Sequence, residues 1–173
     1  MATSVSTAED SADDDCSGDI PDEVRDALSG VALTAAGANV IMQLALLPVG
    51  HGVAKSRVED GRVDKHPIKR ARTTLSYLVV ALLGSDDERD AMRREIDRQH
   101  RQVRSLPGDP VPYNAFDRDL QLWVAACLYR GIEDVHRVLH GELEGDRAAV
   151  IYDHARRLGT TLQVRDDQWP ADR

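Results

Sequence analysis

The stretch DLQLWVAACLYRGIEDVHRVLHG, residues 119–141, repeats its apolar residues with the 3.6-residue period of an α-helix. Asp117 precedes it and can accept hydrogen bonds from the first turn, as a capping residue does. An apolar stripe of this kind predicts a helix that is buried along one face. The stripe consists of Leu120, Val124, Cys127, Leu128, Gly131, Val135 and Val138.

Helical periods also occur on both sides of this stretch, whereas no useful run has the two-residue period of a strand. Ser85-Asp86-Asp87-Glu88 is a capping-box sequence, Pro67 is expected to start a helix, and Pro48 is expected to stop one. The chain is therefore predicted to be all-α. Its other helices are expected at about residues 21–28, 31–47, 67–84, 85–106 and 146–158, with Leu75, Leu78, Met92, Ile96, Leu120, Val124, Leu128 and Val135 largely buried.

The net charge of −8 is concentrated at the N-terminus of the 173-residue chain. Residues 1–26 hold nine acidic residues and one basic residue, which accounts for the whole excess. The remainder is balanced, so it has no net field that would attract nucleic acid or an anionic membrane. Residues 1–20 are predicted to form a disordered acidic tail, and residues 21–173 a single helical domain.

The cysteines and the uncharged stretch 29–50 bear on the compartment. Cys16 and Cys127 do not make a disulfide framework, and a reducing cytoplasm is expected. The uncharged stretch is long enough to cross a bilayer, but Asn39 and Gln43 would leave polar groups in hydrocarbon. A buried helix is therefore favoured over a stable membrane span.

His100 lies near the apolar side of the helix that Ser85 begins. Ile96 and Val103 help to define that side, and at 100° per residue His100 lies about 60° from its centre. A neutral imidazole directed into an apolar pocket suits a metal or a haem iron. A hydrogen-bonded core histidine is the commoner reason for such a position, and the helix by itself leaves both interpretations open.

Arg70 and Thr74 share a narrow stripe with Tyr77 and Ala81 at the edge of an aliphatic helix face. A guanidinium at such an edge can bind an anionic cofactor group, such as a carboxylate, through two charge-assisted hydrogen bonds. The alternative is an ordinary helix edge with Arg70 in solvent.

The remaining motifs are weaker. Glu133 and His136 have the E-x-x-H spacing of di-iron bundle proteins, but Glu133 and His140 are predicted to lie in solvent, with His136 at the edge of the buried face. A second E-x-x-H is missing, so a di-iron site is disfavoured. The chain has no glycine-rich phosphate loop, H-E-x-x-H or G-x-S-x-G sequence, which leaves nucleotide-binding, zinc-protease and serine-hydrolase classes without support.

Several segments, taken in order, resemble the oxygenase family that contains bacterial latex-clearing protein and the MpaB-like oxygenase of the fungal mycophenolic-acid pathway. The resemblance implies a globin-like helical bundle that holds haem b and cleaves carbon–carbon double bonds of isoprenoid chains with dioxygen. On the matching positions, His100 is the iron ligand, and Arg70 and Thr74 are catalytic and cofactor-binding residues beside the haem. The segments are ANVIMQLALLPVGHGV (38–53), HPIKRARTTLSYLVVALLG (66–84), IDRQHRQVRS (96–105) and VPYNAFDRDLQLWVAACLY (111–129).

The chain also departs from the family's pattern. Ala125 stands where many relatives have a histidine, Leu44 to Leu47 stand where many read LAHP, and Thr73 replaces a lysine of the rubber-cleaving branch. The substrate of that branch is therefore not implied. Relatives usually continue beyond WPADR, so the family's C-terminal segment is expected to be missing.

The leading hypothesis is a haem b-dependent oxygenase acting with dioxygen on a hydrophobic small molecule, isoprenoid-like or another lipid. His100 would hold the iron, Arg70 would anchor a propionate, and Thr74 would order that region. The alternative is a non-catalytic helical binding or scaffold protein derived from the same family, acting as part of a homo-oligomer.

Overall fold

The computed structural model describes residues 20–27, 39–56 and 66–173. Within these ranges it contains helices and no strand, which confirms the all-α prediction. The predicted acidic tail lies outside the described residues, apart from Ile20. The elements are α1 (Asp22–Ala27), α3 (Asn39–Ala45), α4 (Leu47–Ala54), α5 (Pro67–Leu83), α6 (Asp86–His100), α7 (Arg118–His140), α8 (Gly145–Ala155), α9 (Arg157–Thr160) and the 3-10 helix η3 (Asp166–Gln168).

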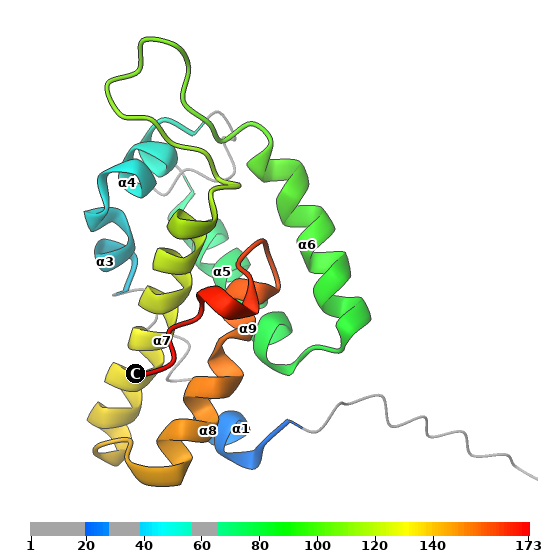
Figure 1. The fold of residues 1–173 in the computed structure, drawn as a ribbon, viewed down its shortest axis with the longest axis vertical. Coiled ribbons are helices and arrows are strands. Elements are labelled where there is room, and N and C mark those ends of the chain that lie inside the picture. Colours follow the sequence, from blue (N-terminus) through cyan, green and yellow to red (C-terminus); the bar gives the residue numbers. More distant parts are fainter. Residues whose placement is uncertain (1–19, 28–38, 57–65) are drawn as a thin grey trace, which may run out of the picture.

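Helix α7 is the central element of the bundle (Figure 1). Both α3 and α9 pack against it, and α5 packs against α6 and α9. As predicted, Asp117 caps α7: its carboxylate accepts hydrogen bonds from the backbone N–H groups of Asp119 at 2.9 Å and Leu120 at 3.1 Å. None of the described helices is long and apolar enough to cross a membrane.

Helix α6 begins as predicted and ends earlier than predicted. Ser85 and Glu88 form the full capping box, with the Ser85 N–H donating to the Glu88 carboxylate at 2.8 Å. The helix ends at His100 rather than near residue 106, because the chain then pairs with the segment before α7. The Ser105 N–H donates to the Tyr113 carbonyl at 2.8 Å, so it is not available to the carbonyl four residues earlier as a longer helix would require.

Pro48 does not stop a helix; it lies in the first turn of α4, which starts at Leu47. A proline in this place forfeits no hydrogen bond, because the first N–H groups of a helix have no partner within it. The prediction of one helix over residues 31–47 is thus wrong where it can be compared, since α3 ends at Ala45 and residues 31–38 lie outside the described ranges. The helix expected over residues 146–158 is likewise divided at Arg156 into α8 and α9.

The hydrophobic core forms where α5, α7, α8 and α9 meet. Leu78, Leu128 and Val135 are buried as predicted. Leu120 is only half-buried, and the remaining predicted core residues, Leu75, Met92, Ile96 and Val124, are partly buried and pack against the core.

The buried face of α7 is rotated from the predicted stripe. It includes Gln121, Ala125, Ile132 and His136, whereas Val138 is 83% exposed. The prediction for Val138 was therefore wrong, and so was the placement of His136 at an edge. The rotation follows from packing on two sides, since α3 and α9 both contact this helix.

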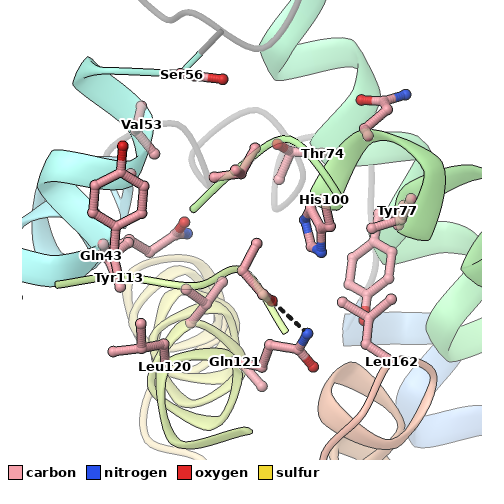
Figure 2. Close-up of a pocket in the computed structure, with 18 of the residues that line it drawn as sticks. Gln43, Val53, Ser56, Thr74, Tyr77, His100, Tyr113, Leu120, Gln121 and Leu162 are labelled. Carbon is pink, nitrogen blue, oxygen red and sulfur yellow. Dashed lines mark hydrogen bonds between the residues drawn. The ribbon is translucent and has the colours of Figure 1, made fainter. Parts of the chain in front are cut away.

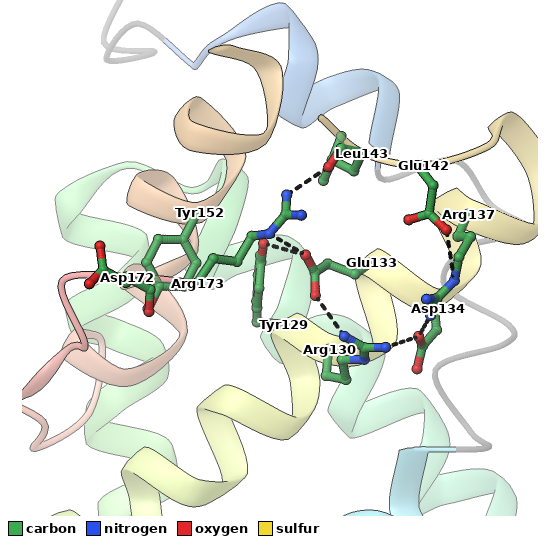
Figure 3. A network of polar contacts seen from close by, with 10 residues as sticks. All are labelled: Tyr129, Arg130, Glu133, Asp134, Arg137, Glu142, Leu143, Tyr152, Asp172 and Arg173. Carbon is green, nitrogen blue, oxygen red and sulfur yellow. Dashed lines mark hydrogen bonds and ion pairs between the residues drawn. The ribbon is translucent and has the colours of Figure 1, made fainter. Parts of the chain in front are cut away.

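Glu133 does not lie in solvent as predicted, because the C-terminal segment folds over α7 (Figure 3). Only 11% of its side chain is exposed. Its carboxylate accepts a hydrogen bond from the Tyr129 hydroxyl at 2.9 Å and pairs with Arg173 at 3.1 Å and with Arg130 at 3.4 Å. Three partners satisfy this charge, so Glu133 is a structural residue. The described residues contain no group of three or more histidine, cysteine or acidic side chains that could hold a metal ion.

Tyr77 joins α5 to α9 through a buried hydrogen bond from its hydroxyl to the Leu158 carbonyl at 2.6 Å. We expect Tyr77→Phe to lower the free energy of unfolding by about 1–3 kcal/mol, because it leaves a buried carbonyl without this donor. Chemical denaturation of the apoprotein measures the change. Tyr113→Phe is the matched control, since this tyrosine is only partly buried and the loss of its hydroxyl should cost less than about 0.5 kcal/mol. Equal effects of the two variants would contradict this account.

Candidate functional site

A cavity of about 220 Å³ lies between α4, α5, α6 and α7. Thr74, His100 and Tyr77 border it on one side, and Leu120 and Gln121 of α7 border it on the other (Figure 2). Much of the remaining wall is aliphatic and comes from Pro48, Val49, Val53, Ile96, Val124, Leu128 and Leu162.

His100, the last residue of α6, contributes its ring to the cavity wall. The ring packs edge-on against Phe116, with centroids 6.1 Å apart and planes at 89°. Its Nδ1 atom is buried and has no hydrogen-bond partner among the described residues. A hydrogen-bonded core histidine, the commoner interpretation of this position, does not describe such a ring.

The imidazole of His100 is neutral at ordinary pH. Its pKa is lowered from 6.5 to about 4, mainly by burial and secondly by the charge of Arg70, while Asp97 acts in the opposite direction. A neutral imidazole keeps a lone pair free on one ring nitrogen, which is the form that binds a metal.

Arg70 lines the same cavity from α5 and is partly buried. Burial lowers the pKa of its guanidinium. No carboxylate in the described part of the chain offsets this effect of burial on Arg70, although a partly buried cation without a counter-ion is costly. The arrangement suits an anionic group placed beside Arg70, and the alternative of a side chain in open solvent does not fit.

Thr74 lies one turn after Arg70, and its hydroxyl donates to the Arg70 carbonyl at 3.0 Å. The structure therefore brings all three residues predicted from the sequence, His100, Arg70 and Thr74, to one cavity.

Gln121 is a cavity residue that the sequence analysis missed. It is buried on the rotated face of α7, one turn before Ala125, which also lines the cavity. The sequence did contain a signal for this residue. Gln121 lies four residues before Ala125 and seven before Leu128, so the helical period puts it on the face that these two buried residues share. The predicted stripe, centred on Leu120 and Val124, placed this glutamine outside it.

In the described part of the chain, fold and cavity together define a helical protein in which an apolar pocket presents a neutral imidazole and a guanidinium. Over residues 25–173 the chain matches the family described as ER-bound oxygenase mpaB/B'/Rubber oxygenase, catalytic domain, and it belongs to that family.

Two mycobacterial proteins are similar to this chain. The uncharacterized protein Rv2237 of Mycobacterium tuberculosis and the uncharacterized protein Mb2261 of Mycobacterium bovis are each 57% identical to it over 136 residues. The match covers 79% of this chain and 53% of each relative, so the chain spans about half the length of the curated relatives it matches. No solved structure matches the chain.

The low pKa of His100 predicts how the stability of the apoprotein depends on pH. The unfolded chain takes up a proton on this residue near pH 6.5, whereas the folded chain does so only near pH 4. The unfolded state therefore binds more protons in this window, and the free energy of unfolding should fall by on the order of 1–3 kcal/mol as the pH drops through it.

Denaturant titrations of wild type and His100→Gln at pH 7 and pH 4.5 measure this contribution. The variant should lose less stability than the wild type on acidification. His140→Gln, which changes an exposed histidine of α7, serves as the control and should follow the wild type. Parallel losses in wild type and His100→Gln would exclude a buried neutral imidazole.

Proposed function

We propose that this chain forms a haem b-dependent oxygenase unit that acts on a hydrophobic small molecule with dioxygen. Its membership of a family of oxygenase catalytic domains supports the reaction class. The observation that carries the proposal is the His100 ring, which lines an apolar cavity and whose buried Nδ1 has no hydrogen-bond partner among the described residues.

The residues of the cavity fit a haem. His100 would bind the iron through its neutral imidazole, because a ring held neutral by burial does not need to lose a proton first. Arg70 would pair with a propionate, which supplies the counter-ion that the described residues lack. The haem would supply the one-electron and dioxygen chemistry that protein side chains do not provide.

The chain's own residues would bind and orient the substrate. The aliphatic side chains from α4, α7 and the segment after α9 exclude water and favour an apolar molecule, such as an isoprenoid or another lipid. Because the Thr74 hydroxyl proton is used on the Arg70 carbonyl, Thr74 presents lone pairs and meets a bound group as an acceptor.

Titration with haem tests the proposal. The wild type should show a Soret band, and His100→Ala should abolish or shift it, because this change removes a direct bond to iron. Arg70→Ala should keep the ligand but weaken the affinity roughly ten- to a hundredfold, the effect of losing charge-assisted hydrogen bonds. The two variants should therefore differ in kind.

His140→Ala is the control for this titration, because His140 is exposed at the end of α7. His136→Ala is less suitable, since His136 is buried and its Nδ1 lies 3.1 Å from the Gly141 carbonyl. If the wild type binds no haem, or if His100→Ala leaves both spectrum and affinity unchanged, the oxygenase proposal fails. A non-catalytic helical binding protein would then be the better account.

A further inference from the structure

The helix that carries His100 has few apolar contacts of its own. Helix α6 contains no fully buried residue, and its apolar contribution to the core consists of the partly buried Met92 and Ile96. His100 is its last residue, where helices ordinarily fray. Hydrophobic packing therefore fixes the position of this end only loosely, and polar contacts have a larger share in it.

Two glutamines connect this end of α6 to α7. The Gln163 side-chain amide donates to the Asp97 carboxylate at 2.8 Å, three residues before His100. On its other side, the Gln163 side-chain carbonyl accepts from the Gln121 amide. The Gln163 backbone N–H donates to the Gln121 side-chain carbonyl at 2.9 Å.

The direction of every bond in this chain of contacts is determined. A backbone N–H can only donate, so the carbonyl of the Gln121 side chain must face Gln163. The Gln121 Nε2 group then faces two acceptors, Gln163 Oε1 and the Ala115 carbonyl, the latter at 2.7 Å. Gln163 consequently turns its own Nε2 group toward Asp97, and a carboxylate is the acceptor it needs. Neither amide can be flipped without breaking several bonds.

The same contacts reach the chain on the far side of His100. Ala115, which accepts from Gln121, donates its own N–H to the Val103 carbonyl. The two glutamines are therefore linked to the Asp97 side chain, three residues before His100, and through Ala115 to the Val103 carbonyl, three residues after it. A histidine bracketed in this way is held at one place on the cavity wall.

We infer that Gln163 is a positioning residue, which together with Gln121 fixes the end of α6 so that His100 faces the cavity. Neither the predicted haem contacts nor the apolar core explains a pair of hydrogen-bonded amides at this place, with Gln121 buried and Gln163 partly buried. The role as a positioner of an iron ligand rests on the proposed function, whereas the immobilisation of α6 does not.

Amide hydrogen exchange in the apoprotein tests the immobilisation directly. Gln163→Leu should accelerate exchange over residues 96–104 roughly five- to thirtyfold while leaving the middle of α7 unchanged. Gln168→Leu is the matched control, because Gln168 lies on the same C-terminal segment and donates to Asp119 of α7 at 3.3 Å, without a recorded contact to α6. Unchanged exchange in Gln163→Leu, or equal acceleration in Gln168→Leu, overturns the inference.

Asp97 provides a second pair of variants that disturbs the interior less. Asp97→Asn retains an oxygen that can accept from Gln163, whereas Asp97→Ala does not. A positioning role predicts that Asp97→Asn exchanges within about threefold of the wild type and that Asp97→Ala resembles Gln163→Leu. If Asp97→Asn is as fast as Asp97→Ala, charge rather than the hydrogen bond is responsible and the inference fails.

The haem-loaded protein supplies the readout that a purely structural role would not change. At saturating haem, Gln163→Leu should give a Soret band broadened or split by a mixture of ligation states, and Gln168→Leu should give the wild-type band. An identical band in Gln163→Leu overturns the positioning of the ligand. A wild type that binds no haem defeats the proposed function instead, and because exchange is measured without haem, the two failures are distinguishable.

Discussion

The burial of α7 on more than one side is the constraint on which the rest of the molecule depends. Because α3 and α9 both pack on this helix, its middle must be apolar over a wide arc, and the small residues Ala125 and Gly131 allow close approach. A β-carbon on Gly131 would lie 2.8 Å from the Asn39 side-chain nitrogen, so the Asn39 side chain would have to move. The cavity occupies the N-terminal half of the same helix, beside Gln121 and Ala125. Core and cavity are thus two parts of one helix surface.

Local signals in the sequence predicted the class of fold and singled out three residues, Arg70, Thr74 and His100, that line the cavity. The caps at Ser85 and Asp117 act over a few residues, and the helical period placed His100 toward the interior, so these features needed no knowledge of distant contacts. Errors arose where distant segments meet. Arg173 approaches Glu133 across 40 positions, and Gln163 approaches Asp97 across 66. Periodicity along one helix carries no information on such partners, which is why the rotation of α7 and the glutamine pair escaped prediction.

At the cavity wall, the positive charge of Arg70 disfavours protonation of His100. The guanidinium lowers the pKa of the imidazole, so the arrangement that keeps His100 neutral also leaves a cation without a counter-ion in the described structure. An anion beside Arg70 would reduce the desolvation cost of that cation and weaken its effect on the ring. Binding of such a group would therefore stabilise the folded state and link the stability of this helical bundle to the occupancy of its cavity.

The contact between Gln163 and Asp97 also bears on the order in which the molecule is assembled. Residues 66–100, which supply Arg70, Thr74 and His100, leave the ribosome well before Gln163 and before Leu158, the partner of Tyr77 across 81 positions. Helices α5 and α6 can form early from local contacts, but Leu158 and Gln163, which bind them, are synthesised later. A nascent polypeptide would thus display His100 before the contact between Gln163 and Asp97 could fix the end of α6.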